Sequence, residues 1–263
     1  MPADSEELGR EEEALALQEA ISVGRTRLTR TFPEVLATGL VGGIDVSLGV
    51  AALLVVEHET GSRLLGALAF TIGFIALILG KTELFDENYL APVAAVIAEK
   101  SGFVSLLRLW AGTATMNLVG GWIFAGLTAA ALSPLHDTAV SVAKFYPERG
   151  VTWESFALGA LGGAVITLMT WMEHGSATEF GKIVAAIVAG FLIAAAPLIH
   201  VIVMSAEMFV ALHTGAPFGY ADWAGAAAWA AFSNIVGGVV LVTLLRLIQV
   251  QAGHEEEPID EEQ

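Results

Sequence analysis

The sequence predicts an all-α membrane protein of six transmembrane helices, built as two three-helix halves that repeat each other in opposite orientation. Three observations predict this fold: an apolar composition, six long apolar stretches, and short motifs that recur in order in both halves. Hydrophobic residues make up 55% of the 263 residues and charged residues only 15%, against about 25% charged residues in a soluble domain. Lipid therefore solvates most of this chain.

Six apolar stretches each reach the length of about 20 residues that a membrane span needs. They cover residues 35–56, 64–98, 103–133, 152–172, 183–212 and 222–249. We expect one transmembrane domain over 31–251, with repeat halves at about 31–133 and 152–249. Residues 1–30 are predicted to be an acidic, amphipathic segment, and 252–263 an acidic tail.

Polar residues interrupt the second and fifth stretches, which are also too long for one plain helix. The second contains Lys81-Thr82-Glu83-Leu84-Phe85-Asp86-Glu87-Asn88, and the fifth contains Pro197, His200, Ser205 and Glu207. Irregular backbone at membrane depth is tolerated only where it is buried in protein or lines a cavity. Paired breaks in two halves indicate a transport site near the bilayer midplane. We therefore expect broken second and fifth helices around such a site.

Three short motifs form the internal repeat. Gly39-Leu40-Val41-Gly42-Gly43 resembles Gly159-Ala160-Leu161-Gly162-Gly163, Glu83-Leu84-Phe85 resembles Glu207-Met208-Phe209, and Asn117-Leu118-Val119-Gly120-Gly121 resembles Asn234-Ile235-Val236-Gly237-Gly238. Because each half has three spans, an odd number, the second half must be inserted upside down. Close helix packing alone also favours glycine-rich motifs, but matched Glu and Asn are not ordinary packing residues.

The basic residues predict that both termini lie in the cytoplasm, with the protein in the plasma (inner) membrane. If the N-terminus is cytoplasmic, the three outer-loop basic residues are Arg63, Lys144 and Arg149. The inner segments then hold the larger share: Arg10, Arg25, Arg27, Arg30, Lys100, Arg108, Lys182 and Arg246. This asymmetry follows the positive-inside rule.

Composition also excludes several classes of function. A net charge of −16 argues against a nucleic-acid partner. The chain has no Cys, which rules out disulfides and Cys-ligated metals. We find no HExxH, no GxSxG and no cluster of His ligands, so we expect no enzyme, no cofactor and no metal site.

Ionisable residues within or beside spans are functional candidates, because a charge at the bilayer centre costs at least about 2.5 kcal/mol. They are Asp45, Lys81, Glu83, Asp86, Glu87, His200 and Glu207. Glu83 and Glu207 are expected at the two breaks, where their carboxylates would accept from free backbone N–H groups. Asn117 and Asn234 would either satisfy the same free backbone or join neighbouring helices.

Four further residues have two interpretations each. Phe85 and Phe209 are either apolar constrictions that gate a pore by dewetting or ordinary packing residues. His200 is either a proton donor or a hydrogen bond between helices. Lys144, in the long outer loop, is either simply solvated or attracts anions to a pore mouth.

The pattern resembles the formate/nitrite transporter family over roughly residues 30–250. The matching segments are Glu83-Leu84-Phe85, Lys144, Ala206-Glu207-Met208-Phe209 and Ser233-Asn234-Ile235-Val236-Gly237-Gly238. The resemblance implies an aquaporin-like protomer in the bilayer, assembled as a homopentamer with one pore per protomer that passes formate, nitrite or hydrosulfide. It implies that Phe85 is the loop constriction and Lys144 the outer lysine that attracts anions.

The chain departs from this family at its centre. Asp86 stands where the family usually has Thr after Glu-Leu-Phe, and Glu207 replaces the Asn of an Ala-Asn-Met-Phe motif. Val203 stands where the family has His, four residues earlier. His200 lies about one turn away and is not expected to substitute, so the Thr–His pair is predicted to be absent. The chain is similar to a divergent, YfdC-like branch.

The sequence thus favours a channel or transporter for a small monovalent anion or its protonated form. Acids at the centre would repel anions, so a neutral-solute or cation channel is one alternative. The missing Thr–His pair keeps open another, a non-conducting membrane scaffold or sensor.

Overall fold

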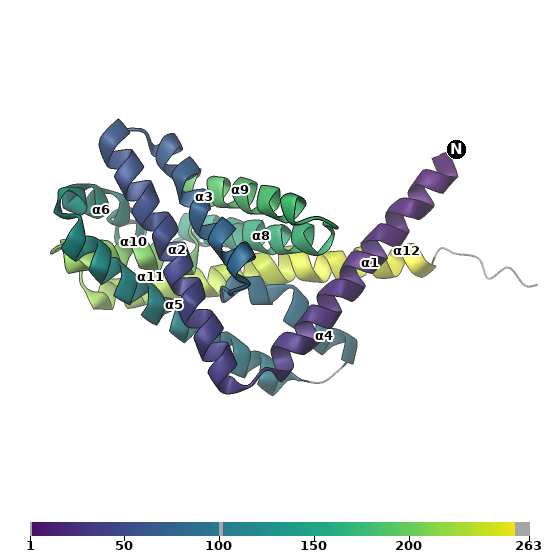
Figure 1. The fold of residues 1–263 in the computed structure, drawn as a ribbon. Coiled ribbons are helices and arrows are strands. Elements are labelled where there is room, and N and C mark those ends of the chain that lie inside the picture. The colour runs from purple at the N-terminus through teal and green to yellow at the C-terminus, as the bar shows by residue number, and fades with distance from the viewer. Residues whose placement is uncertain (1, 100–101, 256–263) are drawn as a thin grey trace, which may run out of the picture.

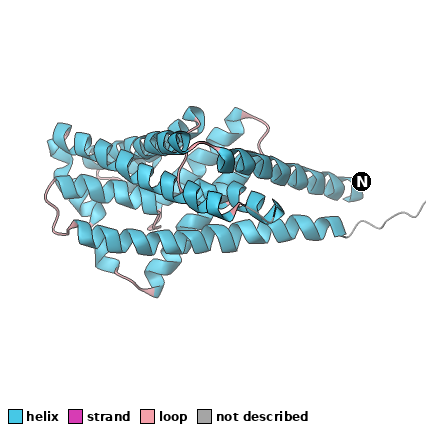
Figure 2. Cartoon of the chain, turned by 90° about the horizontal axis from the view of Figure 1, so that it is seen from below, coloured by secondary structure: helices cyan, strands magenta, loops and turns pink. Residues whose placement is uncertain are grey.

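A computed structural model describes residues 2–99 and 102–255, and every regular element in those ranges is a helix. The helices form an elongated bundle (Figures 1 and 2). Helix α6 lies near one end of the bundle, and α1 and α12 lie near the other (Figure 1). We refer to these as the α6 end and the α1 end.

The elements follow one another with short connections. The first part of the chain contains α1 (Pro2–Thr29), α2 (Phe32–Thr60), α3 (Arg63–Gly80), η1 (Asp86–Tyr89), α4 (Ala91–Glu99) and α5 (Phe103–Ala131). A connecting segment holds η2 (Ser133–Leu135), α6 (His136–Ala143) and α7 (Phe145–Arg149). The last part contains α8 (Trp153–His174), α9 (Glu179–Ala195), α10 (Val201–His213), α11 (Tyr220–Ile235), the π-helix η3 (Val236–Leu244) and α12 (Leu245–Glu255).

Five helices of the described ranges are long and apolar enough to cross a membrane: α2, α3, α5, α8 and the continuous helix Tyr220–Ala252. The predicted stretch 183–212 is divided at 196–200 into α9 and α10, of 17 and 13 residues. The stretch 64–98 is divided in the same way between α3 and α4. A chain with this many apolar helices is a multi-pass membrane protein.

Local chemistry explains where these helices stop. Lys81 follows α3 with a left-handed φ of 54°, which turns the chain out of the helix. Pro197 follows α9, and the residue before a proline is disfavoured in the helical region. Ala196 is accordingly extended, with φ −84° and ψ 158°.

The predicted N-terminal segment forms the helix α1, which packs against the end of the bundle opposite α6 (Figure 1). Its Ala16 and Leu17 are buried in a small cluster with Leu90, Ala94 and Trp171. Lys100, one of the basic residues assigned to the inner segments, lies outside the described residues. So do residues 256–263 of the predicted acidic tail.

Glycines allow two pairs of helices to touch backbone to backbone. A Cβ on Gly43 of α2 would lie 2.1 Å from the carbonyl oxygen of Asn117 in α5. A Cβ on Gly163 of α8 would lie 2.1 Å from the carbonyl oxygen of Asn234 in α11. Such approach is the usual reason for small residues at membrane helix contacts, and it holds both asparagines at fixed heights in the bundle.

Replacing Gly163 with Ala should therefore destabilise the protein by about 1–3 kcal/mol, because a backbone oxygen cannot move aside as a side chain can. The melting temperature of the detergent-solubilised protein measures this. Gly225→Ala is the matched control, since its added Cβ meets nothing within 4 Å. Equal melting temperatures for the two variants would contradict the tight contact.

Candidate functional site

Two irregular segments, residues 81–90 and 196–200, are each held by one asparagine. In the first, the backbone N–H of Phe85 donates to Asn117 Oδ1 at 2.8 Å. Asn117 Nδ2 donates to the carbonyl oxygens of Gly39 at 2.7 Å and of Glu83 at 2.9 Å. The side chain of Asn117 is fully buried. It therefore satisfies two backbone groups of the irregular segment that no helix would satisfy and also joins α5 to α2 through Gly39, so it has both of the roles expected for it.

Asn234 makes the same three contacts with the second segment. Its Oδ1 accepts from the backbone N–H of Val201 at 2.8 Å. Its Nδ2 donates to the carbonyl oxygens of Gly159 and Ile199, both at 2.8 Å. Ile199 and Val201 thus occupy in the second segment the places of Glu83 and Phe85 in the first.

Two predictions about the acids at the breaks are wrong. Glu207 lies inside α10 rather than at the interruption, because the helix resumes at Val201, before the motif that suggested the match with Glu83. Glu83 is at its break, but its carboxylate is bound by Arg27 and Arg30, at and just after the end of α1. Glu87 instead accepts from a free backbone group, the N–H of Leu84, at 3.3 Å.

The two segments bring Asp86 and His200 together at the centre of the bundle. His200 Nε2 lies 3.0 Å from Asp86 Oδ2, and both side chains are fully buried. The contact has the distance of an ion pair without the alignment of a hydrogen bond. His200 Nδ1 accepts from the backbone N–H of Val203 at 3.3 Å, which assigns the proton to Nε2, the nitrogen facing Asp86.

His200 was not expected to substitute for the family's His at position 203, yet the structure places its imidazole against Asp86. Residues 196–200 are not helical, so His200 does not lie where helical counting back from Glu207 would put it. His200 is the N-cap of α10 in an extended conformation, with φ −117° and ψ 119°. Val203 is buried within α10, and its contact with this centre is through its backbone N–H.

Aromatic side chains pack around the segment that carries Asp86, and two buried hydroxyls of the domain are unpaired. The ring of Phe85 packs edge-on against Tyr89 and Trp110, with centroids 5.1 and 5.9 Å away. Tyr89 and Thr113 are fully buried, and neither hydroxyl has a hydrogen-bond partner among the described residues. Buried polar groups are normally paired, so unpaired hydroxyls mark places where a polar solute or water fits.

A cavity of about 270 Å³ lies on the α1 side of the first segment. Glu83 lies beside it and binds two arginines: Nε of Arg27 in α1 is 3.0 Å from its Oε1, and Arg30, directly after α1, also donates to Oε1. Arg27 further donates to Asn88 Oδ1 at 3.1 Å. Helix α1 is thereby attached directly to the interrupted segment.

The cavity has a mixed charged lining. Its basic side chains are Arg27, Arg30, Lys81 and Lys182, and its acidic side chains are Glu83, Glu87, Glu173 and Glu179.

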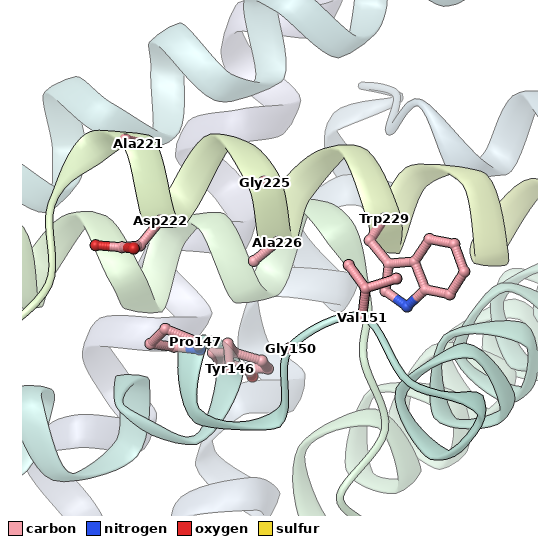
Figure 3. Close-up of a pocket in the computed structure, with 9 residues that line it drawn as sticks. All are labelled: Tyr146, Pro147, Gly150, Val151, Ala221, Asp222, Gly225, Ala226 and Trp229. Carbon is pink, nitrogen blue, oxygen red and sulfur yellow. The ribbon is translucent and has the colours of Figure 1, made fainter.

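At the α6 end, Glu207 and Phe209 project from α10 toward other elements. Tyr146 of α7 donates a hydrogen bond to Glu207 Oε2, and Phe209 packs on Trp223 with centroids 4.9 Å apart. A cavity of about 250 Å³ lies between α7 and α11, with Tyr146, Asp222 and Trp229 in its lining (Figure 3). Lys144 is exposed at the start of α7.

Sequence reasoning missed several of these residues. Arg27 and Arg30 entered only as orientation signals, although two arginines one helical turn apart near a span could have suggested a buried acidic partner. Glu173 and Tyr146 gave no signal, because their partners come from distant elements. Among the described residues, no group of three His, Asp or Glu side chains could hold a metal ion.

Replacing Asn234 with Ala should strand the backbone N–H of Val201 and the carbonyl of Ile199, and it removes the contact with Gly159 of α8. Each buried unpaired group costs about 1–3 kcal/mol, so the purified variant should melt well below wild type or fail to assemble. The exposed Gln251 provides a surface control, Gln251→Ala. A wild-type melting temperature for Asn234→Ala would show that water replaces the side chain.

Known proteins share this sequence and fold. The profile of the family described as formate/nitrite transporter matches residues 14–248. The uncharacterized transporter YrhG of Bacillus subtilis (strain 168) is 27% identical over 246 residues, covering 87% of this chain and 90% of that protein. The inner membrane protein YfdC of Escherichia coli (strain K12) is 27% identical over 257 residues, covering 90% and 79%. A pentameric formate channel with formate bound has the same fold, with a TM-score of 0.72, 21% identity and coverage of 84% of this chain and 98% of that chain. This chain belongs to the formate/nitrite transporter family.

Proposed function

We propose that this protein is a channel for a small monovalent anion such as formate or nitrite, which crosses the centre as its protonated, neutral form. The observation that carries the proposal is the buried Asp86–His200 pair, 3.0 Å apart where the two irregular segments meet. A buried carboxylate repels an anion strongly in a medium of low dielectric constant. A neutral acid avoids this repulsion and can donate to Asp86 or accept from His200.

The proposal includes an inverted repeat of six spans with an aquaporin-like arrangement. Helices α3 and α4 would together form the second span, and α9 and α10 the fifth, each interrupted at the centre. The support is the matched hydrogen bonds of Asn117 and Asn234: in each half the side-chain oxygen accepts from one N–H of the irregular segment and the side-chain nitrogen donates to one of its carbonyls. Interrupted spans that meet at the midplane are typical of such transporters.

The proposed route runs from the cavity at the α1 end, past the centre, to the α6 end. Phe85 is buried next to Asp86, and Phe209 is buried on the far side of the centre in α10. Both suit apolar constrictions that exclude water and hydrated ions. Lys144 is exposed at the α6 end, where a positive charge would raise the local concentration of anions. Val203 would support the centre through its backbone.

We further propose that the α1 end is cytoplasmic, which places both termini there, and that five copies assemble with one pore in each. Arg25, Arg27 and Arg30 lie at the α1 end, as the positive-inside rule requires. The similar channel of known structure is pentameric by its description. The native protein should then have five times the 27.5 kDa mass of one chain, which native mass spectrometry measures directly; a monomeric mass would contradict the assembly.

Asp86 also favours a second candidate, a pore for a neutral solute or a cation. A carboxylate at the centre would attract a cation for the same reason that it repels an anion. A membrane scaffold that conducts nothing is the remaining alternative.

Stopped-flow flux in proteoliposomes distinguishes these functions. Formate and nitrite flux through the wild type should rise as the pH falls, because more substrate is protonated. Asp86→Thr should increase flux at neutral pH by about tenfold, because the anion itself could then also enter the centre; this equals removing about 1.4 kcal/mol of electrostatic barrier to the charged form. Asp137→Asn, at the exposed start of α6, is the control with the same loss of charge. If wild type and Asp86→Thr are both silent to anions while urea or a cation passes, the second candidate is correct.

A further inference from the structure

We propose that the cavity at the α1 end is a loading site, where an entering carboxylate or nitrite is attracted by basic side chains and receives a proton from Glu87. This inference rests on the proposed anion channel and adds to it the residue that supplies the proton. It also addresses how an anion could approach a centre that contains Asp86.

The cavity is large enough and suitably charged to receive such an ion. Its volume of about 270 Å³ compares with about 30 Å³ for one water in the liquid, so a small anion fits with part of its hydration shell. Arg27 and Arg30 are engaged with Glu83, and Lys182 pairs with Glu179 at 3.8 Å, but Lys81 has no acidic partner among the described residues. The ammonium group of Lys81 is therefore free to attract an anion, and that of Lys182 is held only by a long ion pair.

The backbone at Lys81 supports a role for its side chain. Lys81 is the one residue other than glycine with a positive φ, 54°, in the described ranges. This conformation costs roughly 1–2 kcal/mol in a residue with a Cβ, and glycine adopts it freely. A lysine at this position places an ammonium group beside the cavity at that cost.

Glu87 is the acid best placed to give up a proton. It is 5% exposed and lines the cavity. In contrast to Glu83, it forms no ion pair among the described residues; Arg27 approaches only its backbone oxygen, at 3.5 Å. A buried carboxyl group without a cationic partner and beside other carboxylates is more stable as the neutral acid than as the anion.

The charged groups around Glu87 come from four elements. Helix α1 and the residue that follows it contribute Arg27 and Arg30, the segment after α3 contributes Lys81 and Glu83, α8 contributes Glu173, and α9 contributes Glu179 and Lys182. Glu173 Oε1 and its neighbour His174 Nε2 are buried without hydrogen-bond partners. Glu173 and Lys182 also line a neighbouring cavity of about 550 Å³, so Glu173 lies between the two spaces.

The proton transfer balances without any other reactant. The O–H bond of the Glu87 carboxyl breaks as a new O–H bond forms on formate, giving neutral formic acid and the Glu87 carboxylate. A hydronium ion from bulk solvent, entering through the neighbouring cavity that Glu173 lines, then protonates the Glu87 carboxylate and leaves a water molecule. Asp86 is the residue directly before Glu87 in the chain, so the neutral acid forms next to the position where an anion would be repelled.

Glu87→Gln tests the proton donor. The variant keeps the size of the side chain and an oxygen that can accept from Leu84 N–H, but it has no proton to donate. In proteoliposomes loaded with a pH-sensitive dye, formate flux at pH 7 should fall about tenfold or more. It should approach the wild-type flux at pH 5, where a larger fraction of the formate is already protonated in bulk solution. Glu87→Asp should retain the wild-type pH profile, and the exposed Glu148→Gln at the α6 end is the control. Variants are compared only after their melting temperatures match wild type.

Lys81→Gly tests the attraction step separately. Glycine relaxes the backbone and removes the ammonium group, so the formate concentration for half-maximal flux should rise several-fold while the maximal flux is unchanged. If wild type conducts formate and Glu87→Gln has the same pH profile, the loading site is wrong and the channel proposal stands. If wild type conducts no formate at any pH, both fall.

Discussion

The structure depends on one requirement: backbone N–H and carbonyl groups at membrane depth must find partners inside the protein. Water cannot supply them in the hydrocarbon region, and each group left unpaired there costs several kcal/mol. Two asparagines meet this requirement for two irregular segments, with three hydrogen bonds each. The glycine contacts of α2 with α5 and of α8 with α11 fix the height of each asparagine. The positions of Asp86 and His200 follow from these contacts.

The distribution of charge follows from the same arrangement. Near the interrupted segments, acids and bases occur together. Glu83 pairs with Arg27 of α1 and with Arg30 just after it, and Asp86 faces an imidazole. Removing one member of a buried ion pair usually destabilises a protein strongly, because it leaves the other charge buried and unpaired. Helix α1, which carries no apolar span, is thus bound to the membrane domain by charge as well as by the small apolar cluster around Leu17.

Much of this fold could be predicted from the sequence, because composition and apolar length report directly on membrane spans. The two asparagines could also be predicted as a matched pair, since an Asn three residues before Gly-Gly recurs in both halves. The match between Glu83 and Glu207 predicted the second break at the wrong place. The sequence Glu207-Met208-Phe209 resembles Glu83-Leu84-Phe85, but it lies about two turns inside α10. Local motifs do not reveal where a helix resumes, and the pairing of His200 with Asp86 depends on that position. The contacts of Arg27, Glu173 and Tyr146 join residues far apart in the chain, and no local pattern encodes them.

The π-helix η3 has a consequence for how the last span tolerates change. In a π-helix each hydrogen bond spans five residues instead of the four of an α-helix, so each turn holds more residues. Such stretches often lie near functional sites. Within it, the hydroxyl of Thr243 donates to the carbonyl oxygen of Tyr89 at 2.9 Å, beside the central segment. Each residue of an α-helix turns it by about 100°, so shortening η3 by one residue would rotate all that follows. Arg246 would then leave the face of Trp171, now 5.2 Å away, and α12 would present a different side to α1. The register of this one span therefore couples the centre of the molecule to the surface on which α1 rests.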